Sequence, residues 1–190
     1  MGKTDANLET RRTGLSLGLL MALACLVVLS QMVSVVTAPP APEPGQEAPS
    51  FVGTTTEGAS LASAALRGQV VLLDFWATWC GPCVAALPHL EALRQEFADD
   101  RFRVLGINQE PDSKNRVRRF LRRRAVGFPS VFDEGGAIAR RYGVHTFPTS
   151  FLLDPKGRVL RVYRGYVSPD RLRRDVEDAL ALGKEAGPQE

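Results

Sequence analysis

A continuous apolar run that leads into two closely spaced cysteines constrains the fold more than any other stretch of the chain. The run extends from Val70 to Ala77, and Trp79-Cys80-Gly81-Pro82-Cys83 follows after one intervening residue. Such a run is typical of a central strand that is covered on both faces. Because Pro82 favours the first turn of a helix, the two thiols should lie at a helix N-terminus. The junction therefore predicts a strand, a tight loop and a helix.

The position of the cysteines predicts redox chemistry. Free N–H groups and the positive end of the helix dipole stabilise a thiolate, so Cys80 should lose its proton more readily than an ordinary cysteine. Cys83, one turn further on, can then resolve a mixed disulfide formed at Cys80. The alternative is half of a zinc site, but no second thiol or histidine pair follows at suitable spacing, and His89 lies too far round the helix. We therefore expect a dithiol–disulfide couple that needs no metal and no other cofactor.

Composition sets the scale of the protein and excludes some classes. At 190 residues the chain has room for one domain of ordinary size and an appendage. The 24 basic residues face 21 acidic ones, so the net charge of +3 does not argue for a nucleic-acid partner. The chain has only 3 cysteines, so an apolar core and not a set of disulfides must hold the fold.

A long apolar segment near the N-terminus predicts a membrane anchor. Residues 14–38 are dominated by Leu, Val, Ala and Met, and no residue between positions 13 and 42 is charged. A helix of this length spans a hydrocarbon core of about 30 Å. The segment is longer than a signal-peptide core, and the two prolines after it make a poor cleavage context, which favours a retained anchor over a cleaved signal peptide. Cys25 is then a small apolar residue of that helix and not a lipoprotein cysteine.

The charges on either side of this segment predict its orientation. Lys3, Arg11 and Arg12 precede it, whereas the first charges after it are acidic. The positive-inside rule then keeps the N-terminus cytoplasmic and exports the rest of the chain. The expected organisation is a cytoplasmic N-terminus at residues 1–13, a transmembrane anchor at 14–38, a Pro-rich linker at 39–46, a folded domain at 47–182 and a flexible tail at 183–190.

Periodicity within the domain predicts a central mixed sheet flanked by helices, an α/β fold. A short hairpin is expected at residues 49–58, and a second one around the turn Asp154-Pro155-Lys156-Gly157. The other expected elements are strands at 70–75, 102–107, 128–133, 150–153 and 159–163, and helices at 80–97, 112–124, 136–142 and from 168 onward.

With these elements placed, the chain resembles the thioredoxin superfamily over most of residues 47–182. The block Asp74–Cys83 is similar to the active-site strand and motif of that family, with Pro88 at the position of its helix kink, and Phe147-Pro148-Thr149 is similar to its cis-proline loop. The hairpin extension, the inserted helix at 112–124 and the anchor are more similar to the membrane-anchored TlpA/ResA-like reductases, whose relatives serve cytochrome c maturation. The resemblance implies a thioredoxin-like fold with an N-terminal hairpin extension and a transmembrane anchor.

The resemblance also implies roles for individual residues. Cys80 would be the attacking thiolate, Cys83 the resolving thiol, and Asp74 a buried acid that relays a proton for Cys83. Burial of a carboxylate in an apolar strand should raise its pKa; the alternative is that Asp74 lies partly solvated at the end of the strand. X-Pro bonds are usually trans, but the resemblance implies a cis Pro148 beside the thiols, where it exposes backbone for pairing with the substrate.

Further residues are candidates for substrate contact or for tuning of the site. Glu110 is similar to an acid that some anchored relatives place near the active site, although Pro111 departs from their spacing, and the alternative is an ordinary solvated acid. His145 is expected on the loop surface. The substrate-binding candidates are Trp79, Gly81, Pro82, Thr146 and Phe147.

A run of basic residues extends from Lys114 to Arg124. A charged run on a helix is usually a solvated face, and here Val117, Phe120 and Leu121 supply the buried stripe. The functional alternatives are contact with anionic lipid or with an acidic partner. We favour the solvated face.

The resulting prediction is an enzyme, a membrane-tethered thiol-disulfide oxidoreductase on the extracytoplasmic side of the cytoplasmic membrane. It would reduce disulfides of exported proteins, with apocytochrome c as a candidate client, and would receive electrons from a membrane donor. One alternative is a non-catalytic thioredoxin-fold binding or chaperone module, against which the intact cysteine pair argues. Another is a thiol peroxidase, which shares the Pro49-Ser50-Phe51 start but carries a threonine where this chain has Ala77.

Overall fold

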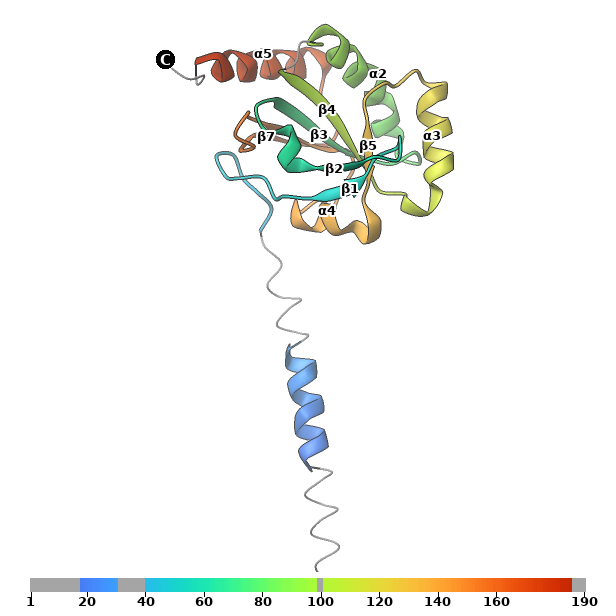
Figure 1. The fold of residues 1–190 in the computed structure, drawn as a ribbon, viewed down its shortest axis with the longest axis vertical. Coiled ribbons are helices and arrows are strands. Elements are labelled where there is room, and N and C mark those ends of the chain that lie inside the picture. Colours follow the sequence, from blue (N-terminus) through green and yellow to red (C-terminus); the bar gives the residue numbers. More distant parts are fainter. Residues whose placement is uncertain (1–17, 31–39, 99–100, 186–190) are drawn as a thin grey trace, which may run out of the picture. The chain divides into compact units, whose positions relative to one another are not determined.

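The computed structural model describes residues 18–30, 40–98 and 101–185 (Figure 1). The chain divides into two units, residues 1–39 and residues 40–190, which are described separately. In the first unit, residues 18–30 form a helix. None of the helices within the described ranges combines the length and the apolarity needed to cross a bilayer. The predicted anchor at 14–38 extends beyond the described residues at both ends and stays a prediction.

A five-stranded mixed sheet forms the centre of the second unit, in the order β5-β4-β3-β6-β7. β3 (Val70–Trp76) lies in the middle and pairs in parallel with β4 (Phe102–Asn108) and antiparallel with β6 (Thr149–Leu153). β5 (Ser130–Phe132) and β7 (Val159–Arg164) complete the two sides. Every residue of β3 is buried, which confirms the prediction of a central strand covered on both faces.

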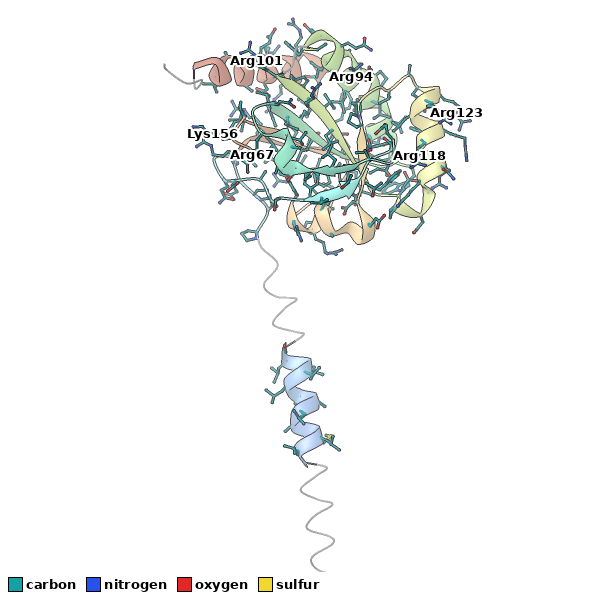
Figure 2. The ribbon with its side chains drawn as sticks, viewed as in Figure 1. Arg67, Arg94, Arg101, Arg118, Arg123 and Lys156 are labelled. Atoms are coloured by element: carbon teal, nitrogen blue, oxygen red, sulfur yellow. A yellow bond between two sulfur atoms is a disulfide. The ribbon has the colours of Figure 1, made fainter. Side chains whose placement is uncertain are left out.

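Helices cover both faces of this sheet. α2 (Gly81–Glu96), α3 (Lys114–Arg123) and α5 (Pro169–Glu185) pack on one face, and the short α4 (Ala137–Arg141) packs on the other. Successive side chains of a strand point to opposite faces, so alternate residues of β3 join the core with α2 or the core with α4. Basic side chains lie around the outside of this unit (Figure 2). The predicted mixed sheet with flanking helices is confirmed.

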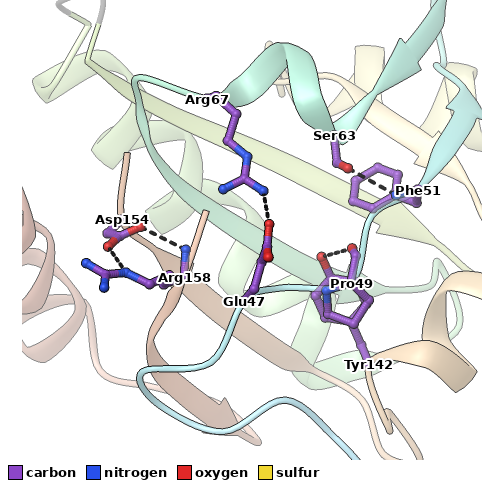
Figure 3. A network of polar contacts seen from close by, with 8 residues as sticks. All are labelled: Glu47, Pro49, Phe51, Ser63, Arg67, Tyr142, Asp154 and Arg158. Carbon is purple, nitrogen blue, oxygen red and sulfur yellow. Dashed lines mark hydrogen bonds and ion pairs between the residues drawn. The ribbon is translucent and has the colours of Figure 1, made fainter. Parts of the chain in front are cut away.

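The N-terminal extension is a hairpin, as predicted, formed by antiparallel β1 (Val52–Thr54) and β2 (Ser60–Ala62). Its second strand lies beyond the predicted range of residues 49–58. Two of the polar contacts in Figure 3 join the two ends of this hairpin to each other: the Phe51 N–H donates to Ser63 Oγ at 3.0 Å, and Arg67 pairs with Glu47. A third contact joins the extension to the end of α4: the Tyr142 hydroxyl donates a hydrogen bond to the Pro49 carbonyl oxygen at 2.8 Å. The hairpin is thereby fastened to the face of the sheet that α4 covers.

Residues 40–46, which the sequence analysis assigned to the linker, pack against the domain. Pro42 is buried, and the Gly45 N–H donates to the Val159 carbonyl oxygen at 2.7 Å. The Val159 N–H in turn donates to the Gln46 carbonyl oxygen at 2.9 Å. The compact unit therefore begins at residue 40.

Several element boundaries differ from the predictions by one or more residues, and three of these differences have a clear physical reason. α3 begins at Lys114 and not at residue 112, because Pro111–Ser113 form a 3₁₀ turn and Ser113 makes no side-chain capping bond. β5 begins at residue 130 and not at 128, since the proline at 129 has no N–H to give to a ladder. α5 runs into the predicted tail and ends at Glu185, because the glycine at 183 costs a helix only about 1 kcal/mol.

Candidate active site

The two cysteines lie at the start of α2, as predicted. Cys80 is the N-cap residue, Cys83 follows in the first turn, and the two form a disulfide with a Cα–Cα distance of 5.2 Å. The Cys83 N–H donates to Cys80 Sγ at 3.3 Å, so a first-turn amide does point at the outer sulfur. Cys80 is 6% exposed and Cys83 is 0% exposed. Cys80 is therefore the cysteine with access to the surface.

Asp74 is buried within β3, which excludes the alternative of a partly solvated strand end. Ser150 stands opposite it on β6, and Ser150 Oγ donates to Asp74 Oδ1 at 2.7 Å. Asp74 Oδ2 has no hydrogen-bond partner among the described residues. Burial raises the pKa of Asp74 to about 7, against a smaller lowering by the Ser150 hydroxyl. The carboxyl group can therefore take up or release a proton near neutral pH.

Asp74 and the buried cysteine share one face of the sheet. Alternate side chains of a strand lie on the same face, so Asp74 points to the same side as Leu72 and Trp76. Leu72 and Trp76 pack in one core cluster with Cys83. The fold therefore directs the only ionisable side chain of β3 toward the α2 side, where the resolving thiol lies.

The Phe147–Pro148 peptide bond is cis, as the resemblance implied. The Gly165 N–H donates to the Pro148 carbonyl oxygen at 2.8 Å and holds the loop from the β7 side. The Phe147 ring meets the Trp79 ring edge to face, with 5.9 Å between the centroids. Trp79 directly precedes Cys80 and is 66% exposed. This contact places the proline loop and the cysteine motif on one surface.

Glu110 is a buried, paired carboxylate and not the solvated acid that was the alternative. It accepts hydrogen bonds from the Thr78 N–H at 2.5 Å, from Thr78 Oγ1 at 2.9 Å and from Arg116 Nη2 at 2.8 Å. Burial acts to raise the pKa of Glu110, but the Thr78 hydrogen bonds and the Arg116 guanidinium outweigh it and lower that pKa. An ionised Glu110 therefore fastens the loop two residues before Cys80.

The other candidates take surface positions. Gly81 and Pro82 form the exposed start of α2, and Thr146 is exposed, with its carbonyl oxygen accepting a hydrogen bond from within the proline loop. His145 is exposed, as expected. The His89 ring meets the Tyr166 ring at 6.3 Å. Within the described ranges, no group of three or more His, Cys, Asp or Glu side chains is arranged to hold a metal ion.

Sequence reasoning missed the partners of Asp74 and Glu110, the two buried acids near the cysteine motif. Ser150 occupies the start of a predicted strand, but its position opposite Asp74 depends on the register between β3 and β6. Thr78 is separated from Glu110 by α2 and β4, and Arg116 follows Glu110 after a turn but is one member of a run of similar residues. The only local signal for Ser150 and Thr78 was a hydroxyl group, which many surface residues also carry.

Comparisons with known proteins agree with this geometry. The family model described as AhpC/TSA family matches residues 44–162. The thiol-disulfide oxidoreductase ResA of Bacillus subtilis (strain 168) is 29% identical, over 94% of this chain and 99% of the relative. ResA of Bacillus thuringiensis subsp. konkukian is 33% identical, over 68% of this chain and 75% of the relative.

Solved structures give the same result. A putative thiol:disulfide interchange protein DsbE from Chlorobium tepidum matches with a TM-score of 0.66 and 31% identity, over 75% of this chain and 99% of its own. StoA from Bacillus subtilis matches with a TM-score of 0.59 and 28% identity, over 67% of this chain and 96% of its own. With its Cys80–Cys83 pair at a helix N-terminus, the chain belongs to the AhpC/TSA family of thioredoxin-fold proteins and, within it, to the ResA-like thiol-disulfide oxidoreductases.

Proposed function

We propose that this protein reduces disulfides of exported proteins and is held at the outer face of the cytoplasmic membrane by residues 14–38. The observation that carries the redox assignment is the asymmetry of the cysteine pair. Cys80 reaches the surface at the helix start, whereas Cys83 is completely buried behind it. Such a pair presents one sulfur to a substrate disulfide, while the second, buried sulfur can later resolve the mixed disulfide.

The proposed reaction has two thiol–disulfide exchanges. In the reduced protein the Cys80 thiolate attacks one sulfur of a substrate disulfide, forming a Cys80–substrate bond and releasing the other substrate sulfur as a thiolate. The Cys83 thiolate then attacks Cys80 Sγ, which releases the second substrate sulfur and closes the Cys80–Cys83 disulfide. Two electrons pass to the substrate, whose two sulfurs leave as thiols after protonation.

Asp74 is proposed to accept the proton of Cys83 for the second exchange. A buried thiol cannot pass its proton directly to solvent, and Asp74 is the carboxylate that β3 directs to the same side of the sheet. A general base works best when its pKa lies near the working pH, and the pKa of Asp74 is raised by burial to about 7. The role is supported by both burial and position.

The substrate chain is proposed to lie along the cis-proline loop. The contact between Trp79 and Phe147 joins this loop to the cysteine motif, and the exposed Trp79 ring offers apolar surface to a substrate. Pro148 would present backbone for pairing with an extended substrate segment. The other proposed contacts are with Gly81, Pro82 and Thr146.

A reducing dithiol in an oxidising compartment needs a continuing supply of electrons, so a membrane donor is part of the proposal. Apocytochrome c in its disulfide form is the proposed client, and its two thiols are the product. A phosphatase fused to the C-terminus should be active only if the domain is exported. An inactive fusion with normal expression would contradict the proposed location.

The reductase activity can be tested with insulin and dithiothreitol. The wild-type chain should accelerate precipitation of the insulin B chain, and Cys80→Ser should abolish the acceleration. In a separate experiment without dithiothreitol, Cys83→Ala should accumulate clients that are disulfide-linked to Cys80, and these can be identified by mass spectrometry. Equal acceleration by wild type and Cys80→Ser would overturn the proposed role of Cys80.

A further inference from the structure

The first turn of α3 adjoins the active-site loop. Arg116 donates to Glu110 at 2.8 Å, and Glu110 in turn accepts the Thr78 N–H, two residues before Cys80. One turn further along α3, the Phe120 ring lies against Trp76, the last residue of β3, with 6.2 Å between the centroids. A surface carried by α3 therefore has a fixed position relative to the reactive cysteine.

The outward side of α3 is basic along its length. The helix contains no acidic residue, and its buried side chains are Val117 and Leu121. Residues 116, 119 and 123 recur at the spacing of one helical face, opposite that buried stripe, and residue 122 lies beside them. Figure 2 shows Arg123 projecting from the outer side of the helix. We call Arg119, Arg122 and Arg123 the basic face.

The basic face lacks internal partners, unlike its neighbours on the same helix. Lys114 pairs with Glu134 at 2.6 Å, and Arg118 donates to the Thr56 carbonyl oxygen at 2.5 Å. Within the described part of the chain, we find no hydrogen bond or ion pair for the side chains of the basic face. These three exposed side chains border one shallow, open depression of the surface.

Three neighbouring guanidinium groups without carboxylates repel one another, and like charges at i, i+3 and i, i+4 destabilise a helix. Packing does not explain their presence, because all three are exposed. An anionic ligand would remove this repulsion. The basic face is therefore positively charged and exposed, and its three guanidinium groups lie around one site, as expected of a binding surface for an acidic group.

We propose that the basic face docks an acidic segment of the disulfide-bonded protein on which Cys80 acts. A redox partner is favoured over a lipid surface because Arg116, on the same side of the helix, is linked through Glu110 to the loop of the cysteine motif. A partner bound to α3 would thus be held with its disulfide near Cys80. This inference rests on the proposed reductase function and adds the chemistry that selects its substrate.

The test compares two synthetic peptides that contain the same disulfide. One carries a stretch of glutamates beside the disulfide and the other carries serines and glycines of equal length. The full-length chain is first reduced with dithiothreitol, freed of it and kept in neutral detergent, so that its Cys80–Cys83 dithiol supplies the two electrons. It is assayed as wild type, as Arg119→Gln/Arg123→Gln, and as Lys156→Gln/Arg174→Gln. The last variant is the control, since it removes the same amount of positive charge, from the β6–β7 turn and from α5. At the helical positions of both variants, glutamine has nearly the helix propensity of arginine.

The wild type should reduce the acidic peptide about tenfold faster than the neutral one at low ionic strength, because opposite charges steer the encounter. Added salt should remove this preference. Arg119→Gln/Arg123→Gln should lose most of the preference and reduce the neutral peptide at the wild-type rate. The control should keep the preference.

Three results would overturn the inference. The first is an unchanged preference in Arg119→Gln/Arg123→Gln, and the second is an equal loss of rate for both peptides, which would mean general damage to the site. The third is a defect confined to binding of phosphatidylglycerol vesicles, which would make the face a lipid contact. Failure of the wild type on the neutral peptide would overturn the reductase function itself, and that outcome is distinguishable because it does not depend on charge.

Discussion

Replacing Asp74 with asparagine should change how the stability of the oxidised domain depends on pH. Burial raises the pKa of Asp74 from 3.8 to about 7 in the folded protein. The unfolded chain has no such burial, so its Asp74 should titrate near 3.8. Between these two values the folded state holds a proton that the unfolded state has lost. Stability therefore falls as the pH rises through this window, and is flat above it.

The magnitude follows from the size of the shift. A displacement of about 3 pKa units corresponds to about 4 kcal/mol at about 1.4 kcal/mol per unit, and about 3 kcal/mol of this is lost between about pH 5 and pH 8. Asp74 is fully buried, so solvent does not screen the effect. Asparagine can still accept the Ser150 hydroxyl but cannot ionise. Its unpaired amide in place of Oδ2 costs about 1–3 kcal/mol at every pH, which leaves the pH dependence unaltered.

Guanidinium unfolding of the full-length oxidised chain, followed by tryptophan fluorescence, measures this difference at pH 5 and pH 8. Asp74→Asn should be less stable than wild type at pH 5. Between pH 5 and pH 8 the free energy of unfolding of wild type should fall by about 3 kcal/mol relative to that of Asp74→Asn. Ser150→Ala is the matched control, because it removes the hydrogen bond that lowers the pKa of Asp74 and should extend the loss of stability to higher pH. Parallel pH profiles for wild type and Asp74→Asn would refute the buried-acid reasoning.

Three further predictions concern other contacts. Glu110→Gln should lower stability by about 1–3 kcal/mol and slow insulin reduction severalfold, because it weakens the Thr78 and Arg116 hydrogen bonds; unchanged urea midpoints and rates would contradict this. Burial acts to raise the pKa of Glu91, but hydrogen bonds from Arg94, Gln95 and Gly127 lower it from 4.5 to about 2, so its contribution is present above pH 4.5 and lost as the pH falls toward 2. Glu91→Gln should therefore differ most from wild type at neutral pH, and a difference that grows in acid would be inconsistent with this sign. Trp79→Ala should change stability by no more than about 0.5 kcal/mol, because the ring is 66% exposed, yet slow reduction of protein disulfides; an intact rate with insulin would remove Trp79 from the substrate surface.

Local sequence patterns were sufficient to predict most elements of the domain. The apolar run of β3, the proline in the first turn of α2 and the turn before β7 each act through neighbouring residues, so their structures follow from short stretches of chain. The boundaries of α3 and α5 were less well predicted because capping bonds and tertiary packing decide where a helix ends. Packing of residues 40–46 onto β7 could not be foreseen, since it depends on contacts with a strand more than 100 residues away.

The cysteine pair and its place at a helix start were determined by the sequence alone, because the motif and the strand before it are contiguous. The burial of Asp74 was suggested by its apolar neighbours, but its pairing with Ser150 required the register of β3 against β6. Only the tertiary structure showed that Glu110 is buried and holds the active-site loop through hydrogen bonds. It also distinguished the basic residues of α3 that have partners from those that have none. The physical reason is common to these cases: hydrogen bonds and ion pairs between distant residues depend on how the elements pack, which no local pattern specifies.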